Sequence, residues 1–178
     1  LRLAVARFNA ERVDLVLFAG DIASTICLPP LRKLQSKVIA CFGDNDGNKL
    51  GLQAGFGIIG RLSETRVHLT TADGTRIVLA HMKQQLRGLE ADYDIAVIGH
   101  THKPRLDRDG GRLIINPGET SGWSFGRPTI AILNTANRDV QFVDLASADV
   151  SRKVVEIPGV IDGPVATRSC SSQKRPGV

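Results

Sequence analysis

The sequence is poor in aromatic residues and in cysteine. Aromatic side chains make up 4% of its 178 residues, so a surface that stacks many nucleic-acid bases is not expected. Its three cysteines are odd in number and form no CxxC pair, which argues against a disulfide framework or a zinc knuckle. We therefore expect reduced, mostly buried thiols.

Long apolar runs are also missing. The longest uncharged apolar runs, such as residues 15–20, are far shorter than the roughly 20 residues that span a bilayer, so no membrane partner is expected. The first residues carry charges at Arg2, Arg7, Glu11 and Arg12, which interrupt any signal-peptide core. A cytoplasmic location is the resulting expectation.

Positive charge is in excess only near the end of the chain. Residues 151–178 hold five basic and two acidic side chains, so +3 of the formal net charge of +5 lies there. The remainder is nearly balanced, and we do not expect a nucleic acid as partner. Proline, glycine, serine and unpatterned charge also predict a disordered tail at residues 149–178, after one domain at residues 1–148.

Short apolar runs that stop at glycine or polar clusters recur through the first hundred residues. They predict buried strands at residues 13–19, 37–42, 76–80 and 94–98. Apolar spacing predicts a helix at residues 1–12, and a proline-led segment predicts another at residues 29–36. Helices that alternate with buried strands indicate an α/β fold with parallel pairing.

The second half of the chain changes to antiparallel patterns. Residues 67–79 alternate around Asp73-Gly74, and residues 105–115 alternate around a turn at residues 109–111, as hairpins do. A last strand pair is expected at residues 129–133 and 140–145.

Metal-binding side chains follow all four buried strands. Asp21, Asp44, His81 and His100 stand directly beyond strand ends, and His102 is two residues further along. An aspartate after a strand is more often a turn or cap residue, but the carboxyl ends of neighbouring strands converge in α/β sheets. Imidazole is the commonest transition-metal ligand in proteins. The pattern therefore predicts a metal site made by these five residues.

These stretches resemble the calcineurin-like metallophosphoesterases, in particular their small, single-domain bacterial and archaeal phosphodiesterase branch. The resemblance rests on "LFAGDI" around Asp21, "CFGDNDGN" around Asp44, "LAHMK" around His81, "IGHTHKP" around His100 and His102, and "IINPGETSGWSFGRPTIAIL" at residues 114–133. It implies an α/β four-layer sandwich, in which two facing mixed sheets are flanked by helices. It also implies that Asp21 bridges two divalent ions, that Asp44, His81 and His100 complete one ion, and that His102 binds the other.

The implied reaction is the hydrolysis of small phosphodiesters by a water that two metal ions activate. Mixed imidazole and carboxylate ligands suit Mn, Fe, Zn or Ni better than Mg or Ca, and the sequence leaves the choice among these four open. A small phosphoester is the expected partner, and a homo-oligomer is left open.

The sequence departs from the family pattern in several places. The Asp-x-His strand with which the family opens is not among these residues, and we expect a truncated sequence rather than a lost half-site. The alternative is a catalytically silent binding module that resembles the phosphoesterase-like subunit of the retromer coat. Asp44 replaces the usual asparagine, Asn45 stands where larger members have a proton-donating histidine, and no general acid is identified. Residues 116–119 are interpreted as a rigid turn rather than as catalytic groups.

Overall fold

The structure, a computed structural model, describes residues 1–146, so the predicted tail at residues 149–178 lies outside the described residues. The described helices are α1 (Arg2–Ala10), α2 (Leu28–Leu31) and α3 (Lys49–Ile59), with short 3-10 turns η1 (Thr25–Cys27) and η2 (Lys83–Leu86). The strands are β1 (Leu15–Phe18), β2 (Lys37–Cys41), β3 (Gly60–Ser63), β4 (Val67–Thr70), β5 (Arg76–Leu79), β6 (Ile95–Val97), β7 (Pro104–Asp109), β8 (Arg112–Pro117), β9 (Thr129–Asn134) and β10 (Asp139–Asp144). No helix among the described residues is long and apolar enough to cross a membrane.

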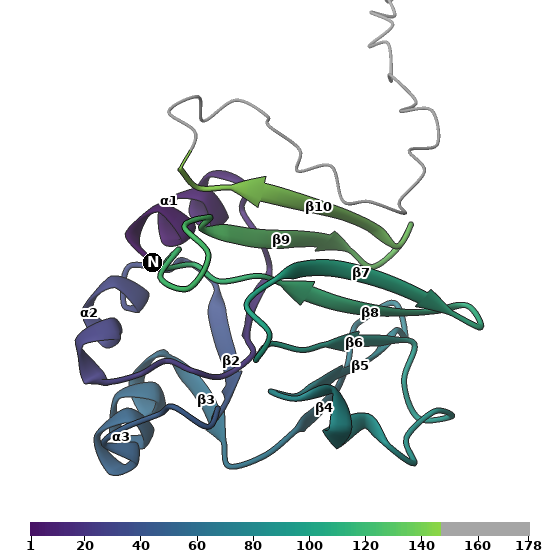
Figure 1. The fold of residues 1–178 in the computed structure, drawn as a ribbon, viewed down its shortest axis with the longest axis horizontal. Coiled ribbons are helices and arrows are strands. Elements are labelled where there is room, and N and C mark those ends of the chain that lie inside the picture. Colours follow the sequence, from purple (N-terminus) through teal and green to yellow (C-terminus); the bar gives the residue numbers. More distant parts are fainter. Residues whose placement is uncertain (147–178) are drawn as a thin grey trace, which may run out of the picture.

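The first half of the chain forms a parallel sheet of three strands in the order β1-β2-β3. The helices α1, α2 and α3 lie against one face of this sheet (Figure 1). The core between them is formed by apolar side chains from both layers, among them Val5, Val16, Leu28, Leu31, Val38, Leu52 and Phe56. Burial of these side chains holds the helices to the sheet, since each buried aliphatic or phenyl side chain contributes about 1.5–3 kcal/mol.

The second half forms a five-stranded sheet in the order β4-β5-β6-β8-β7. Its central strands β5, β6 and β8 run parallel, and the hairpins predicted from the sequence add β4 and β7 as antiparallel edges. The predicted last pair is confirmed as the antiparallel ladder β9–β10, which packs on α1 through Ile130, Val143 and Ala4.

The two larger sheets face each other across a second apolar core. Cys41 and Ile39 from β2 pack there against side chains of the five-stranded sheet, such as Leu79, Val97 and Ile115. The opposite face of the five-stranded sheet is covered by the segment that contains η2, through Leu86 and Tyr93. The predicted four-layer sandwich is therefore confirmed. Only the five-stranded sheet is mixed, however, because the three-stranded sheet contains parallel pairs alone.

Helix α3 and strand β3 were not predicted, and the expected helix at residues 29–36 is shorter than predicted, since α2 ends at Leu31. Three glycines in α3 hide its helical pattern, because glycine costs about 1 kcal/mol relative to alanine in a helix. Tertiary packing outweighs that cost: a Cβ at Gly55 would lie 2.2 Å from a Leu28 methyl group, so glycine permits the close contact of α3 with α2.

Two glycines in this region, Gly57 in α3 and Gly60 at the start of β3, are expected to affect stability in opposite ways when replaced by alanine. A Cβ at Gly60 would lie 1.9 Å from the carbonyl oxygen of Val38, whereas a Cβ at Gly57 meets nothing within 4 Å. We expect Gly60→Ala to lower the free energy of unfolding by about 1–3 kcal/mol through overpacking. Gly57→Ala should raise it by about 0.4–1 kcal/mol, because alanine restricts the unfolded chain. Urea denaturation of both variants measures the difference, and equal effects would contradict the packing seen at β3.

Candidate metal centre

Strands from both sheets end at one edge of the sandwich, and the predicted site residues follow those ends. Asp21 comes after β1, Asp44 after β2 and His81 after β5, while His100 and His102 lie in the loop after β6. The backbones of Asp21, His100 and His102 adopt positive φ values of 55°, 65° and 60°. Such conformations are uncommon for non-glycine residues and cluster at functional sites.

Glycines let the loops approach one another closely. A Cβ at Gly43 would lie 2.2 Å from Oδ1 of Asp21, and a Cβ at Gly20 would lie 2.5 Å from Nδ1 of His81. Gly20 also has φ of +87°, which disfavours other residues. Glycine at both positions therefore allows side chains from both sheets to meet.

The closest group consists of Asp44, His81 and His100. Each offers one ligand atom, and these atoms lie within 4.8 Å of one another. Oδ1 of Asp44 is 2.6 Å from Nε2 of His81 and 3.2 Å from Nδ1 of His100. The carboxylate therefore faces both imidazoles at once.

The hydrogen bonding of His81 determines which ring nitrogen faces the site. Its side chain is 3% exposed, and its Nδ1 lies 2.7 Å from the carbonyl oxygen of Ala19. Because a carbonyl can only accept, Nδ1 carries the proton and donates it, which leaves Nε2 toward Asp44. Two acceptor atoms 2.6 Å apart need a proton or a metal cation between them, so the donor set fits a cation.

Asp21 joins this group to His102. Its Oδ2 is 3.6 Å from Nε2 of His81 and 3.7 Å from Nε2 of His102. The carboxylate is held by Asn45, whose backbone N–H donates to Oδ1 at 2.9 Å and whose side-chain amide donates to Oδ2 at 3.1 Å. Asp21 therefore lies between the two imidazoles in a fixed orientation.

Glu119 is a member of this site that the sequence interpretation missed. Its side chain is 7% exposed, and its Oε2 accepts from Nδ1 of His102 at 3.0 Å. The backbone N–H groups of Ser124 and Phe125 donate to the same carboxylate. Glu119 thus fixes the proton of His102 on Nδ1 and turns Nε2 toward Asp21, as carboxylates do for metal-binding histidines.

Asn116 and Asp46 support the loops without facing the cluster. The side-chain amide of Asn116 donates to the carbonyl oxygen of Gly99 at 2.7 Å and to Oγ1 of Thr101 at 2.9 Å. Asp46 accepts from the backbone N–H groups of Ala23 and Gly43 at 2.8 and 2.7 Å. The turn at residues 116–119, expected to be rigid, therefore also positions the loop that carries both histidines.

Two of the carboxylates that contact histidines, Asp44 and Glu119, have lowered pKa values, which favour the ionised form. Desolvation acts to raise the pKa of Asp44, but a backbone hydrogen bond and the contacts with His81 and His100 outweigh it and lower the pKa. Desolvation likewise opposes ionisation of Glu119, whose pKa is lowered by the N–H groups of Ser124 and Phe125 and by His102. The site therefore presents negative charge toward a cation.

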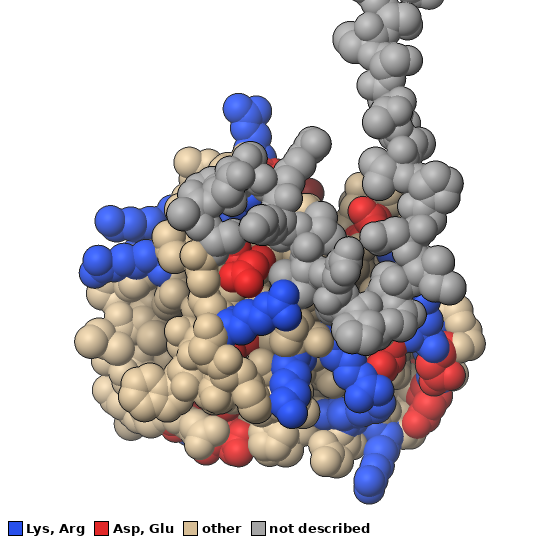
Figure 2. All heavy atoms as spheres, turned by 45° about the horizontal axis from the view of Figure 1, so that its top comes forward, with Lys and Arg blue, Asp and Glu red and all other residues tan. Residues whose placement is uncertain are grey.

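All five residues predicted as ligands meet at this edge of the sandwich: Asp21, Asp44, His81, His100 and His102. Figure 2 shows one face on which basic side chains are separated by acidic and uncharged ones.

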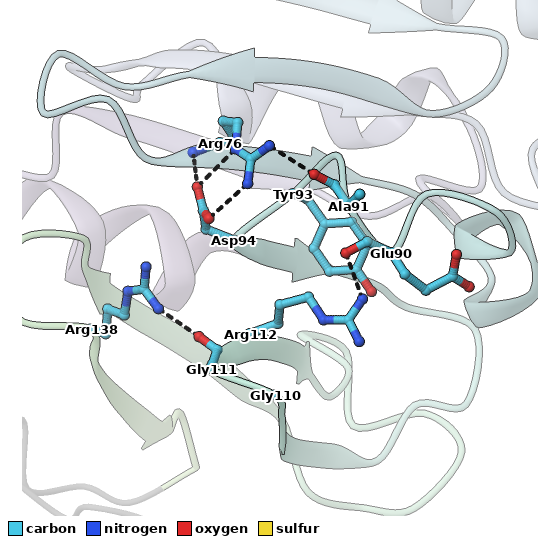
Figure 3. A pocket seen from close by; sticks show the side chains of 9 residues that line it. All are labelled: Arg76, Glu90, Ala91, Tyr93, Asp94, Gly110, Gly111, Arg112 and Arg138. Atoms are coloured by element: carbon cyan, nitrogen blue, oxygen red, sulfur yellow. Dashed lines mark hydrogen bonds and ion pairs between the residues drawn. The ribbon is translucent and has the colours of Figure 1, made fainter.

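An open pocket lies at the opposite ends of the central strands, where β5, β6 and β8 begin (Figure 3). Its arginines are already paired within the protein. Arg76 bonds both carboxylate oxygens of Asp94, Arg112 donates to the carbonyl oxygen of Glu90, and Arg138 donates to that of Gly111. These hydrogen bonds connect the strand ends with neighbouring loops, and none of the predicted site residues lines the pocket.

Comparisons with known proteins identify the family of this chain. The sequence profile of the calcineurin-like phosphoesterase superfamily domain matches residues 1–138. A phosphodiesterase of Methanocaldococcus jannaschii is 28% identical over 156 residues, which cover 82% of this chain and 90% of that protein. The chain therefore belongs to the calcineurin-like phosphoesterase superfamily, as its motifs indicated.

Solved structures share the fold. An archaeal phosphodiesterase superimposes with a TM-score of 0.73 at 27% identity, covering 80% of this chain and 91% of that one. Vps29 of Entamoeba histolytica, solved with zinc, superimposes with a TM-score of 0.63 at 22% identity and covers 83% of this chain and 84% of its own. The second likeness concerns the fold alone.

The Arg76–Asp94 pair makes stability depend on pH. Hydrogen bonds from Arg76 lower the pKa of Asp94 to about 2, so the pair contributes stability above the unfolded-state pKa of about 3.9 and loses it as the pH falls through 2. We expect Asp94→Asn to be less stable than the parent protein at neutral pH, with a difference that shrinks in acid. Thermal denaturation of both proteins between neutral pH and about pH 2 tests this. A difference that stays constant would show that the ionised pair does not contribute.

Proposed function

We propose that this chain is a metal-dependent phosphodiesterase that hydrolyses small phosphodiesters by means of a water activated by two metal ions. The contact between Nε2 of His81 and Oδ1 of Asp44 carries the proposal, because these two atoms face each other at 2.6 Å and a divalent cation between them would satisfy both. The names of two relatives, both phosphodiesterases, support the choice of reaction.

The five clustered residues receive distinct roles in this proposal. Asp44, His81 and His100 would hold one ion, Asp21 would bridge the pair, and His102 would hold the second. Divalent ions at these positions supply charge neutralisation of the phosphoryl group and a bound water of lowered pKa. The chain contributes the orientation of each ligand: Ala19 fixes the ring of His81, and Glu119 fixes the ring of His102.

The leaving group receives little help from Asn45. Both its backbone N–H and its side-chain amide donate to Asp21, and an amide carries no acidic proton. We therefore propose that the enzyme acts best on esters whose leaving group departs as a stable anion. Among the metals that suit the ligands, namely Mn, Fe, Zn and Ni, we propose manganese as the first to test. We also propose that the reaction takes place in the cytoplasm.

The alternative is a catalytically silent binding module with the same fold. Metal content distinguishes the enzyme hypothesis from the binding-module hypothesis. Two ions retained per chain would support the enzyme, whereas no bound ion at physiological metal concentrations would support the binding module. Elemental analysis of the purified full-length protein makes this measurement.

The enzyme proposal predicts a specific loss in one histidine variant. With Mn²⁺, the full-length protein should hydrolyse bis(p-nitrophenyl) phosphate, and His100→Ala should lower kcat/KM at least about tenfold, because Asp44 loses a partner in the metal cluster. His68→Ala is the matched control, since His68 is exposed on β4 and lies outside the site. Activity that survives chelation of the metal, or that His100→Ala leaves intact, would refute the proposal.

The role of Glu119 predicts a change in metal affinity. Glu119→Gln removes a charged acceptor from Nδ1 of His102, so we expect Mn²⁺ affinity to fall roughly 10- to 100-fold. Isothermal titration calorimetry measures the affinity, and far-UV circular dichroism checks that the fold is kept. Glu64→Gln, at an exposed position, is the control. Unchanged affinity in Glu119→Gln would show that this carboxylate serves the loop alone.

A further inference from the structure

A short loop beside the metal centre carries two exposed aromatic side chains. Trp123, the only tryptophan of the chain, is 91% exposed, and Phe125 is 55% exposed. The other phenylalanine and tyrosine side chains of the described residues are buried, such as Phe56 and Tyr93, or half-buried, such as Phe18. Exposed large aromatic side chains gain no stability from burial on folding. Two of them in one short loop beside a candidate active site therefore indicate a surface that binds a ligand.

The loop has a defined backbone conformation. The N–H of Gly126 donates to the carbonyl oxygen of Gly122 at 2.9 Å, and the N–H of Thr129 donates to that of Glu119 at 2.8 Å. The carboxylate of Glu119 accepts from the N–H groups of Ser124 and Phe125, as described above. The rings of Trp123 and Phe125 therefore project from a backbone that is tied down at both ends.

The same bonds place the loop against the proposed ligands. Oγ of Ser124, the residue after Trp123, lies 2.8 Å from Nδ1 of His102. Nζ of Lys103, the residue after His102, lies 4.9 Å from the centre of the Phe125 ring. An aromatic surface and a positive charge thus adjoin the point where a phosphoryl group would lie.

We infer that Trp123, with Phe125 and Lys103, binds a flat aromatic ring, an aryl group or a nucleobase, in the substituent that stays on phosphorus during hydrolysis. This inference rests on the proposed function, and it narrows the substrate class to small esters that carry such a group. A phosphoryl group at Asp21 and His102 leaves its substituent next to the loop, where the ring can stack on the indole. Removal of one stacking side chain typically weakens binding roughly 5- to 150-fold.

Tryptophan fluorescence tests the contact without requiring catalysis. Because Trp123 is the only tryptophan, its emission reports on this loop alone. The protein is loaded with Zn²⁺, because this ion has a filled d shell and no redox activity and so does not quench tryptophan emission. Addition of thymidine monophosphate should then change the emission until the site is saturated. Ethyl phosphate, which has no ring, should not. Equal responses to both probes, or none to thymidine monophosphate, would overturn the inference.

A pair of substrates with the same leaving group tests it during turnover. Thymidine p-nitrophenyl phosphate and ethyl p-nitrophenyl phosphate differ only in the group that stays on phosphorus. We expect kcat/KM to be higher for the thymidine ester than for the ethyl ester. The ratio of the two values should fall roughly 5- to 150-fold in Trp123→Ala, whereas Trp123→Phe should keep most of the preference. Ile58→Ala, at an exposed apolar position on α3, should leave the ratio unchanged.

The outcomes separate this inference from the proposed function. Hydrolysis of both esters without preference, or a ratio that Trp123→Ala does not change, keeps the phosphodiesterase and removes the aromatic site. If neither ester is hydrolysed, the proposed function fails, while the fluorescence titration still decides on the ring contact. Emission that shifts with protein concentration alone would assign Trp123 to a contact between copies of the chain and would overturn the inference.

Discussion

The contact of His81 with Asp44 is the constraint on which the rest of the site depends. Nδ1 of His81 is committed to the carbonyl oxygen of Ala19, so its other nitrogen meets a carboxylate oxygen at 2.6 Å. Two electron-rich atoms at that separation need a proton or a metal cation between them. Asp44 follows β2 and His81 follows β5, so the packing of the two sheets brings the two side chains together.

The two-sheet architecture explains why the cluster forms at this edge. Asp21 and Asp44 follow strands of the parallel sheet, whereas His81 and His100 follow strands of the five-stranded sheet. The apolar core between the sheets sets their separation, and Gly43 allows Asp21 to enter the space that remains. The site is therefore a product of sheet packing, and local loop structure supplies only the final orientation of each side chain.

Glu119 connects the candidate metal ligand His102 with the loop that carries Trp123. One carboxylate orients His102 and also fixes the backbone of Ser124 and Phe125. A buried carboxylate is stable there because N–H groups and an imidazole satisfy its oxygens. The loop that carries Trp123 is consequently held in a fixed position relative to His102.

The sequence by itself determined most of the strands, the hairpins and the candidate metal ligands that follow four of the strands, because these depend on local alternation and on residue type. It was enough to identify the superfamily, since Asp21, Asp44, His81, His100 and His102 stand in its motifs. Only the tertiary structure revealed helix α3, in which Gly55 is favoured by its close contact with Leu28. It also revealed the role of Glu119, whose partner His102 is 17 residues away in the sequence. Contacts between distant residues leave no periodic signal in the chain, so they become visible only when the sheets pack.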